Sequence, residues 1–150
     1  MRCSNYAHGL LGGLAIACSS ERTNAPPAPP LVTVDGVSFR LDTFLWRDFM
    51  PISPPDGKPL VAVLRILTTD GSSIPASVSA DSVWVYNGSE VWATAVVEEQ
   101  PRNNSYFEVV AREGPKWGPG IEVDVVVRLR DGAGHRFLLQ ARRQLISRTD

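Results

Sequence analysis

Apolar and polar residues alternate with a period of two along much of this chain, and this alternation limits the folds it can adopt. In the clearest run the apolar residues are Ile121, Val123, Val125, Val127 and Leu129. The residues between them are charged, except for Val126. Successive side chains of a β-strand point to opposite faces of the sheet, so the run predicts a long strand with one buried and one solvated face.

Turn signals extend this pattern into two predicted hairpins. Asp131–Gly134 turns the chain into His135–Ile146, in which the apolar residues Phe137, Leu139 and Ala141 share one face. The second hairpin covers Val83–Glu98 and turns at Asn87-Gly88. Asn-Gly readily adopts the positive φ angles of a type I′ turn, so we expect a two-residue loop there.

No stretch shows helical spacing over three turns, which indicates an all-β fold. Leu60–Leu67 is almost continuously apolar and predicts a central strand covered on both faces. Further strands are expected at Leu31–Val34, Val37–Leu41 and Tyr106–Ala111. About seven or eight strands separated by Gly, Pro, Asp and Asn predict a single antiparallel β-sandwich, with a small β-barrel as the alternative.

The strand count and the long closing hairpin resemble immunoglobulin-like domains of bacterial surface proteins. The resemblance covers Leu31–Asp150 and concerns architecture, because no diagnostic motif accompanies it and the cysteine pair of antibody domains is missing. It implies an immunoglobulin-like sandwich.

The N-terminal residues have the layout of an export signal. Arg2 is followed by an apolar run that begins after His8 and ends in small residues before Cys18. The run of about ten residues is too short to cross a bilayer as a helix, and the residues after it are polar and Pro-rich. We therefore expect a signal peptide over residues 1–17 and no spanning anchor.

Leu14-Ala15-Ile16-Ala17-Cys18 resembles the lipobox of bacterial lipoproteins, with Ala15 at a position where Leu is commoner. The resemblance implies that Cys18 carries fatty acyl chains and becomes the mature N-terminus, so that the membrane is one partner of the protein. Ser19 is similar to residues that permit sorting to the outer membrane of a two-membrane bacterium. The alternative is an ordinary secretory signal cleaved after Ala17, which would leave Cys18 unmodified.

Residues 18–30 are polar and then dense in proline. Such a segment favours an extended chain and cannot bury much apolar area, so we expect a tether between the membrane and the domain. The domain itself is expected over residues 31–150. Removal of Arg2 with the leader leaves 14 basic and 16 acidic side chains, a balance that argues against nucleic acid as a partner.

The domain offers few groups for catalysis. Cys3 and His8 leave with the leader and Cys18 is consumed by lipid, so His135 is the one imidazole of the mature chain, and no Gly-x-Ser-x-Gly motif accompanies it. The acidic pairs, Glu98 with Glu99 and Glu122 with Asp124, are expected to be solvated surface charges. Asp56-Gly57 and Asp70-Gly71 indicate turns. We therefore predict no catalytic residue, no metal site and no cofactor.

Three aromatic residues surround the second hairpin. If its loop has two residues, Trp84 faces Val91 and Val83 faces Trp92, so the two Trp rings lie on opposite faces of the sheet. A three-residue loop would instead pair Trp84 with Trp92 on one face. We expect the first arrangement, with one Trp in the core and the other half exposed. Cross-strand packing explains these rings, and the alternative is a stacking surface for a sugar formed by Trp84, Tyr86 and Trp92.

Two predicted loops carry the remaining large apolar residues. The segment from Trp46 to Pro51 holds Arg47, Phe49 and Met50, and a second loop displays Trp117 between glycines and prolines. Trp and Arg on rigid supports are typical of protein interfaces. The alternative is that Phe49 and Trp117 close an open end of the domain.

These observations together predict a lipid-anchored protein of the cell envelope. Its expected role is non-enzymatic: binding or scaffolding an envelope protein through Trp46, Arg47, Phe49, Met50 and Trp117. Glycan binding is the second hypothesis, and a hydrolase is the third.

Overall fold

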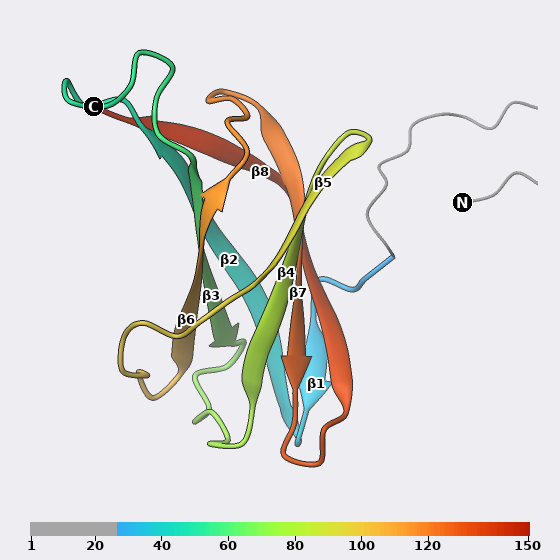
Figure 1. Cartoon of the computed structure of the whole chain (residues 1–150). Helices are drawn as coiled ribbons and strands as arrows, with labels where there is room; N and C mark the ends of the chain where they lie inside the picture. The colour runs from blue at the N-terminus through green and yellow to red at the C-terminus, as the bar shows by residue number, and fades with distance from the viewer. Residues whose placement is uncertain (1–26) are drawn as a thin grey trace, which may run out of the picture.

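In the computed structural model, residues 27–150 are described, and they form eight β-strands and no helix (Figure 1). The strands are β1 (Val32–Val34), β2 (Val37–Asp48), β3 (Leu60–Thr68), β4 (Ser79–Asn87), β5 (Glu90–Ala95), β6 (Tyr106–Gly114), β7 (Glu122–Arg130) and β8 (Arg136–Thr149). The prediction of an all-β fold is confirmed.

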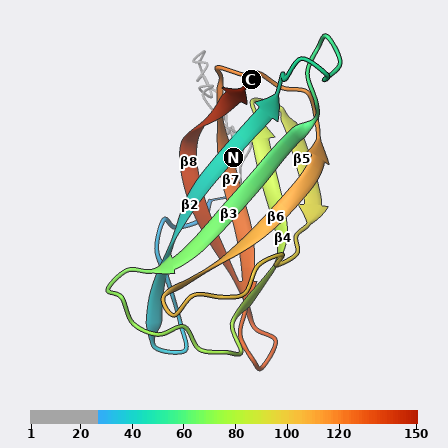
Figure 2. The same ribbon diagram turned by 90° about the vertical axis from the view of Figure 1, so that its left-hand side faces the viewer.

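The strands form one strongly curled sheet, a half-barrel, in the order β5-β4-β7-β8-β2-β3-β6, with β1 paired to the start of β2. Figures 1 and 2 show β3 and β6 facing β4 and β7 across the interior. A single bridge between Val97 and Val110 links the segment after β5 to β6. The two ends of the strand order are therefore brought close together.

β8 connects the two halves of the sheet. It pairs antiparallel with β7 over most of its length and parallel with the end of β2 only from Ile146 to Thr149. The ladder with β7 is irregular near Arg143, which has a φ of 57°. Such a bulge bends a strand and lets it change partners.

The core lies inside the curl and is aliphatic apart from two phenylalanines. Alternate residues of β3, namely Leu60, Ala62, Leu64 and Ile66, are fully buried. Together with Phe39, Phe107 and the inward valines of β4 and β7, they form one continuous cluster. This is the period-two pattern expected for strands with a single buried face.

The strand predictions are confirmed in outline and corrected in three details. β2 continues to Asp48, so Trp46 and Arg47 lie in a strand and not in a loop. β3 is buried on one face and half-exposed on the other, so it is not covered on both faces. The β4–β5 loop consists of Gly88 and Ser89, since Asn87 pairs with Glu90.

The leader and Cys18 lie outside the described residues, as does most of the tether. The last residues assigned to the tether contact the domain. The backbone N–H of Gln140 in β8 donates a 2.9 Å hydrogen bond to the carbonyl of Pro29. The ordered domain therefore includes residues just before Leu31.

Candidate partner-binding surface

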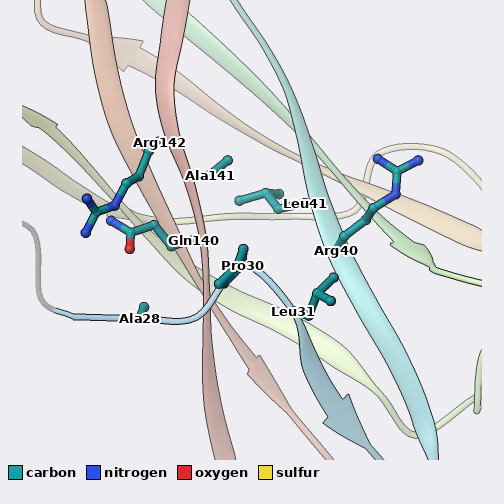
Figure 3. Close-up of a pocket in the computed structure, with 8 residues that line it drawn as sticks. All are labelled: Ala28, Pro30, Leu31, Arg40, Leu41, Gln140, Ala141 and Arg142. Carbon is teal, nitrogen blue, oxygen red and sulfur yellow. The ribbon is translucent and has the colours of Figure 1, made fainter.

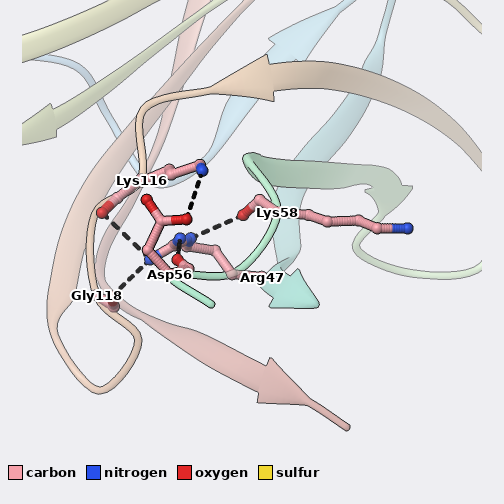
Figure 4. A network of polar contacts seen from close by, with 5 residues as sticks. All are labelled: Arg47, Asp56, Lys58, Lys116 and Gly118. Carbon is pink, nitrogen blue, oxygen red and sulfur yellow. Dashed lines mark hydrogen bonds and ion pairs between the residues drawn. The ribbon is translucent and has the colours of Figure 1, made fainter. Parts of the chain in front are cut away.

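Arg47 is buried, with 3% of its surface exposed, and it fixes two loops (Figure 4). Its guanidinium donates to the carbonyls of Lys58 at 2.9 Å, Gly118 at 2.8 Å and Lys116 at 3.2 Å, and also to that of Asp56. The carbonyls of Asp56 and Lys58 belong to the loop after β2, and those of Lys116 and Gly118 belong to the loop after β6. The prediction of Arg47 as an exposed contact residue is wrong, because its guanidinium is buried against backbone carbonyls of the domain itself.

An ion pair on the surface joins the same two loops. Lys116 Nζ lies 2.9 Å from Asp56 Oδ1. The hydrogen bond from Lys116 is the largest influence on Asp56 and lowers the pKa of its carboxyl below the usual value. Both side chains are exposed, so the pair adds little stability compared with the buried guanidinium.

Phe49 is half-buried between these loops and the C-terminal end of β8. Its ring lies 5.0 Å from the guanidinium carbon of Arg47 and 4.2 Å from that of Arg148. A Cβ added at Gly57, which has a φ of 81°, would clash with the Phe49 ring, so this close approach requires glycine. Trp117 also packs against the buried cluster. The Phe49 ring lies against two arginines and Trp117 against the core, so both rings cover this end of the domain.

The exposed apolar residues begin immediately beside this closed end. Met50 is 43% exposed and Ile52 is 87% exposed in the loop after β2. Sequence reasoning selected Met50 but not Ile52. Both side chains present apolar surface to solvent, so both are available to a partner.

A second apolar group lies on the outer face of β2. The rings of Phe44 and Trp46 stack with their centroids 4.9 Å apart and their planes at 22°. Phe44 is 51% exposed, and its cross-strand partner on β3 is Val63. Trp46 is opposite Val61. We call Phe44, Trp46, Val61 and Val63 the β2 strip.

Sequence reasoning missed Phe44 for a physical reason. The second half of β2 has polar Thr43 and Arg47 among its inward residues and apolar Phe44 and Trp46 among its outward residues, so the alternation of apolar and polar residues disappears there. The signal that remains is the spacing of the two aromatic residues by two positions, which places their rings on one face of a strand.

The aromatic residues of the β4–β5 hairpin lie on two faces, as expected. Trp92 is opposite the buried Val85 and packs against the core, which removes it from the predicted sugar surface. Trp84 and Tyr86 lie on the outer face, and the guanidinium carbon of Arg128 is 5.7 Å from the Trp84 ring. Burial raises the pKa of the Tyr86 hydroxyl. The cross-strand partners differ from the prediction, because Trp84 is opposite Ala93 and not Val91.

His135 belongs to the turn between β7 and β8. Its Nδ1 lies 2.9 Å from Asp131 Oδ2, and its side chain is 73% exposed. The other carboxyl oxygen of Asp131 accepts hydrogen bonds from the backbone N–H groups of Ala133 and His135. The hydrogen bond from His135 is the largest influence that lowers the pKa of the Asp131 carboxyl. These contacts explain Asp131 and His135 as residues that stabilise a tight turn.

The acidic residues considered for glycoside hydrolysis all bind arginines. Glu98 pairs with Arg102 at 2.8 Å and Glu99 with Arg112 at 2.7 Å. The Arg112 hydrogen bond lowers the pKa of the Glu99 carboxyl, which opposes the raised pKa that a general acid needs. Glu122 Oε1 lies 3.6 Å from Arg143 Nε, and the backbone N–H of Arg143 donates a hydrogen bond to Asp124 Oδ1.

Within residues 27–150, no group of three or more His, Cys, Asp or Glu side chains could hold a metal ion. The same part of the chain contains no helix long and apolar enough to cross a membrane. Comparison of the chain with protein-family models, curated proteins and solved structures found no match.

Proposed function

We propose that this chain is a lipid-anchored protein of the cell envelope whose β-domain binds a partner protein without catalysis. The observation that carries the binding proposal is the aromatic pair of the β2 strip, in which half-buried Trp46 stacks on exposed Phe44, and exposed Met50 and Ile52 follow in the loop after β2. Stacked rings on a strand are already ordered before binding, so a partner would gain apolar contact at little cost in side-chain entropy.

The contacts that hold the loop after β2 in place favour the same proposal. Arg47 leaves the inner face of β2 and fixes the loop that carries Met50 and Ile52 through the carbonyls of Asp56 and Lys58. A loop held at its far end by a buried guanidinium presents its apolar residues in a restricted set of positions. Rigid supports of this kind are typical of interface hot spots.

The immunoglobulin-like assignment is part of the proposal. It is supported by the two antiparallel hairpins β4–β5 and β7–β8 in one half of the sheet and by β2, β3 and β6 in the other. The connections from β3 to β4, β5 to β6 and β6 to β7 each run between the halves. Two facing groups of antiparallel strands joined by such connections are typical of these sandwiches.

Site-specific photo-crosslinking in the source cells tests the binding proposal. The crosslinking residue replaces Phe44, Ile52 or, as the control, the exposed Arg136 of β8. We expect one and the same protein to be captured from positions 44 and 52 and not from position 136. Trp46→Ser should reduce capture from position 52, because it removes one of the stacked rings. Equal capture from all three positions, or none from 44 and 52, would overturn the proposal.

Glycan binding is the second candidate, and the shared outer face of Trp84 and Tyr86 favours it. A sugar stacked on the half-buried Trp84 ring would change the fluorescence of this residue. Titration with cell-wall oligosaccharides should then give a saturable signal that Trp84→Leu removes and Trp46→Leu does not. A signal that persists in Trp84→Leu would reject this candidate.

A further inference from the structure

β2 and β8 separate from each other over most of their lengths, and this separation creates a pocket. They pair only through Leu45–Asp48 and Ile146–Thr149, while the start of β2 pairs with β1. The segment before β1 crosses the opening and is held by the hydrogen bond from Gln140 to Pro29. The resulting cavity has a volume of about 420 Å³, within the range of roughly 300–1,000 Å³ typical of small-molecule sites (Figure 3).

One part of the pocket lining is aliphatic. It consists of the side chains of Leu41, Ala141, Ala28, Pro30 and Leu31. Leu31 is 53% exposed, although it lies beside the core strand β2. None of the lining residues in the described part of the chain carries an aromatic ring, so the cavity suits a flexible aliphatic chain better than a flat ring.

The polar part of the lining has an unmet hydrogen-bonding requirement. Gln140 is only 4% exposed, and its Nε2 has no hydrogen-bond partner among residues 27–150. A buried donor without an acceptor is rare and marks a site that a ligand or water can satisfy. Gln140 projects from β8 towards the same side of the pocket as Arg142 in Figure 3.

The two arginines of the lining differ in their availability. Arg40 is paired with Asp42, with 2.8 Å between the nitrogen and oxygen, and its guanidinium points away from the other lining residues in Figure 3. Arg142 forms no ion pair with any residue between 27 and 150. The pocket therefore presents one uncompensated positive charge next to one orphaned amide donor.

We propose that this pocket binds a small aliphatic carboxylate, with the alkyl chain against Leu41, Ala141 and Pro30 and the carboxylate on Gln140 and Arg142. A carboxylate accepts hydrogen bonds from both an amide N–H and a guanidinium, and the charge-assisted bond to arginine is the stronger of the two. An alkyl alcohol of the same length would fill the same cavity but leave the charge of Arg142 unmatched. The site is separate from the β2 strip and does not depend on the partner-binding proposal.

Calorimetric titration of the full chain carrying Cys18→Ala, which cannot accept lipid, tests this proposal with octanoate and 1-octanol. We expect saturable binding of octanoate and at least about tenfold weaker binding of 1-octanol, since a hydrogen bond to a charged group is worth more than a tenfold change in affinity. Arg142→Gln should weaken octanoate binding to a similar extent. Arg136→Gln is the matched control, because Arg136 is exposed on the same strand but does not line the pocket.

A second measurement locates the bound ligand. Backbone amide shifts in the NMR spectrum should move on octanoate addition at Ala28, at Leu31 and at residues 40–42 and 140–142. Gln140→Leu should abolish the shift of the neighbouring amides without unfolding the domain. Shifts confined to other residues would overturn the proposal. Equal affinity for octanoate and 1-octanol, or unchanged octanoate affinity in Arg142→Gln, would overturn it as well.

Discussion

The buried guanidinium of Arg47 is stabilised by carbonyls instead of by a carboxylate. Removing a charged group from water is costly unless its donors are satisfied, and here four backbone oxygens accept from it. In the sequence, Arg47 stands beside Asp48 among large apolar residues, and protein interfaces have the same composition. Only the continuation of β2 through Asp48 decides that this side chain points inward.

Arg47→Met should lower the free energy of unfolding by about 3 kcal/mol, because several charge-assisted hydrogen bonds of roughly 1.5–3 kcal/mol each are replaced by apolar contact and unpaired carbonyls. Urea unfolding measures this loss. Arg136→Met is the control and should change stability by less than about 0.5 kcal/mol, since Arg136 is an exposed side chain. Similar losses in both variants would show that Arg47 does not fix the two loops.

Asp81 makes the stability of the domain depend on pH. Burial acts to raise the pKa of its carboxyl, but hydrogen bonds from Arg128 and Ser82 and the charges of Arg128 and Arg130 outweigh this effect and lower the pKa. A carboxyl whose pKa is lowered by folding stabilises the protein above its unfolded pKa of about 3.9. This contribution to stability is lost as the pH falls through the pKa of the Asp81 carboxyl in the folded protein.

Asp81→Asn should therefore lower the unfolding free energy by about 1 kcal/mol at pH 7, the value of a partly exposed charged pair. Below about pH 4 the difference from the parent protein should shrink. Urea unfolding between pH 7 and pH 2.5 measures both effects. In an Arg128→Met background the substitution should have a smaller effect at pH 7. A constant difference at every pH would contradict the assignment of Asp81 to this ion pair.

At the scale of elements, alternation predicts the strands that have one apolar and one polar face. β7 and the first part of β8 follow this pattern, and both lie within a few residues of their predicted bounds. The predicted β2 is too short because the outer face of this strand carries Phe44 and Trp46. The strand that departs from the simple pattern is thus the one that carries the proposed contact surface, as expected when function requires exposed apolar residues.

The β4–β5 hairpin shows how a turn can be misplaced without changing the faces of its strands. The sequence predicts a loop at Asn87-Gly88, but Gly88 with a φ of 62° and Ser89 form it instead. The predicted and the observed loop both have two residues. The strand register differs between them, but in each register Trp84 and Trp92 lie on opposite faces of the sheet. The inward position of Trp92 was therefore predictable, whereas its partner Val85 was not.

The contact between Trp92 and Gly114 of β6 tests this inward position. A Cβ added at Gly114 would lie 2.7 Å from the indole ring, and the φ angle of Gly114 is not positive, so the effect of Ala is steric. Gly114→Ala should lower the unfolding free energy by about 1–3 kcal/mol through overpacking. The cost should be smaller in a Trp92→Leu background, which a double-mutant cycle measures. An equal cost in both backgrounds would place the indole elsewhere.

At the scale of the whole molecule, the sequence predicts an all-β domain but not how its sheet curls. The curl depends on β8 bending at the bulge near Arg143, pairing with β7 as far as Leu145 and with β2 from Ile146 onwards, a contact between residues far apart in the sequence. Neither periodicity nor turn chemistry specifies such a pairing. The pocket between β2 and β8 was unpredictable for the same reason.

The proposed lipid anchor determines in which compartment the domain meets its partner. Two or more acyl chains on Cys18 would hold the chain to a bilayer, because each buried methylene contributes about 0.8 kcal/mol. The partner of the β2 strip would then be an envelope protein, and the proline-rich residues before the domain would set its distance from the membrane.

Lipid anchoring is tested by the mass of the mature protein extracted from membranes of a bacterial host, with Cys18→Ala as the comparison. We predict a chain that begins at Cys18 and carries acyl groups, and a variant that is unprocessed or released from the membrane. A mature chain that begins at another residue, or one with a free thiol at Cys18, would contradict the proposed anchor.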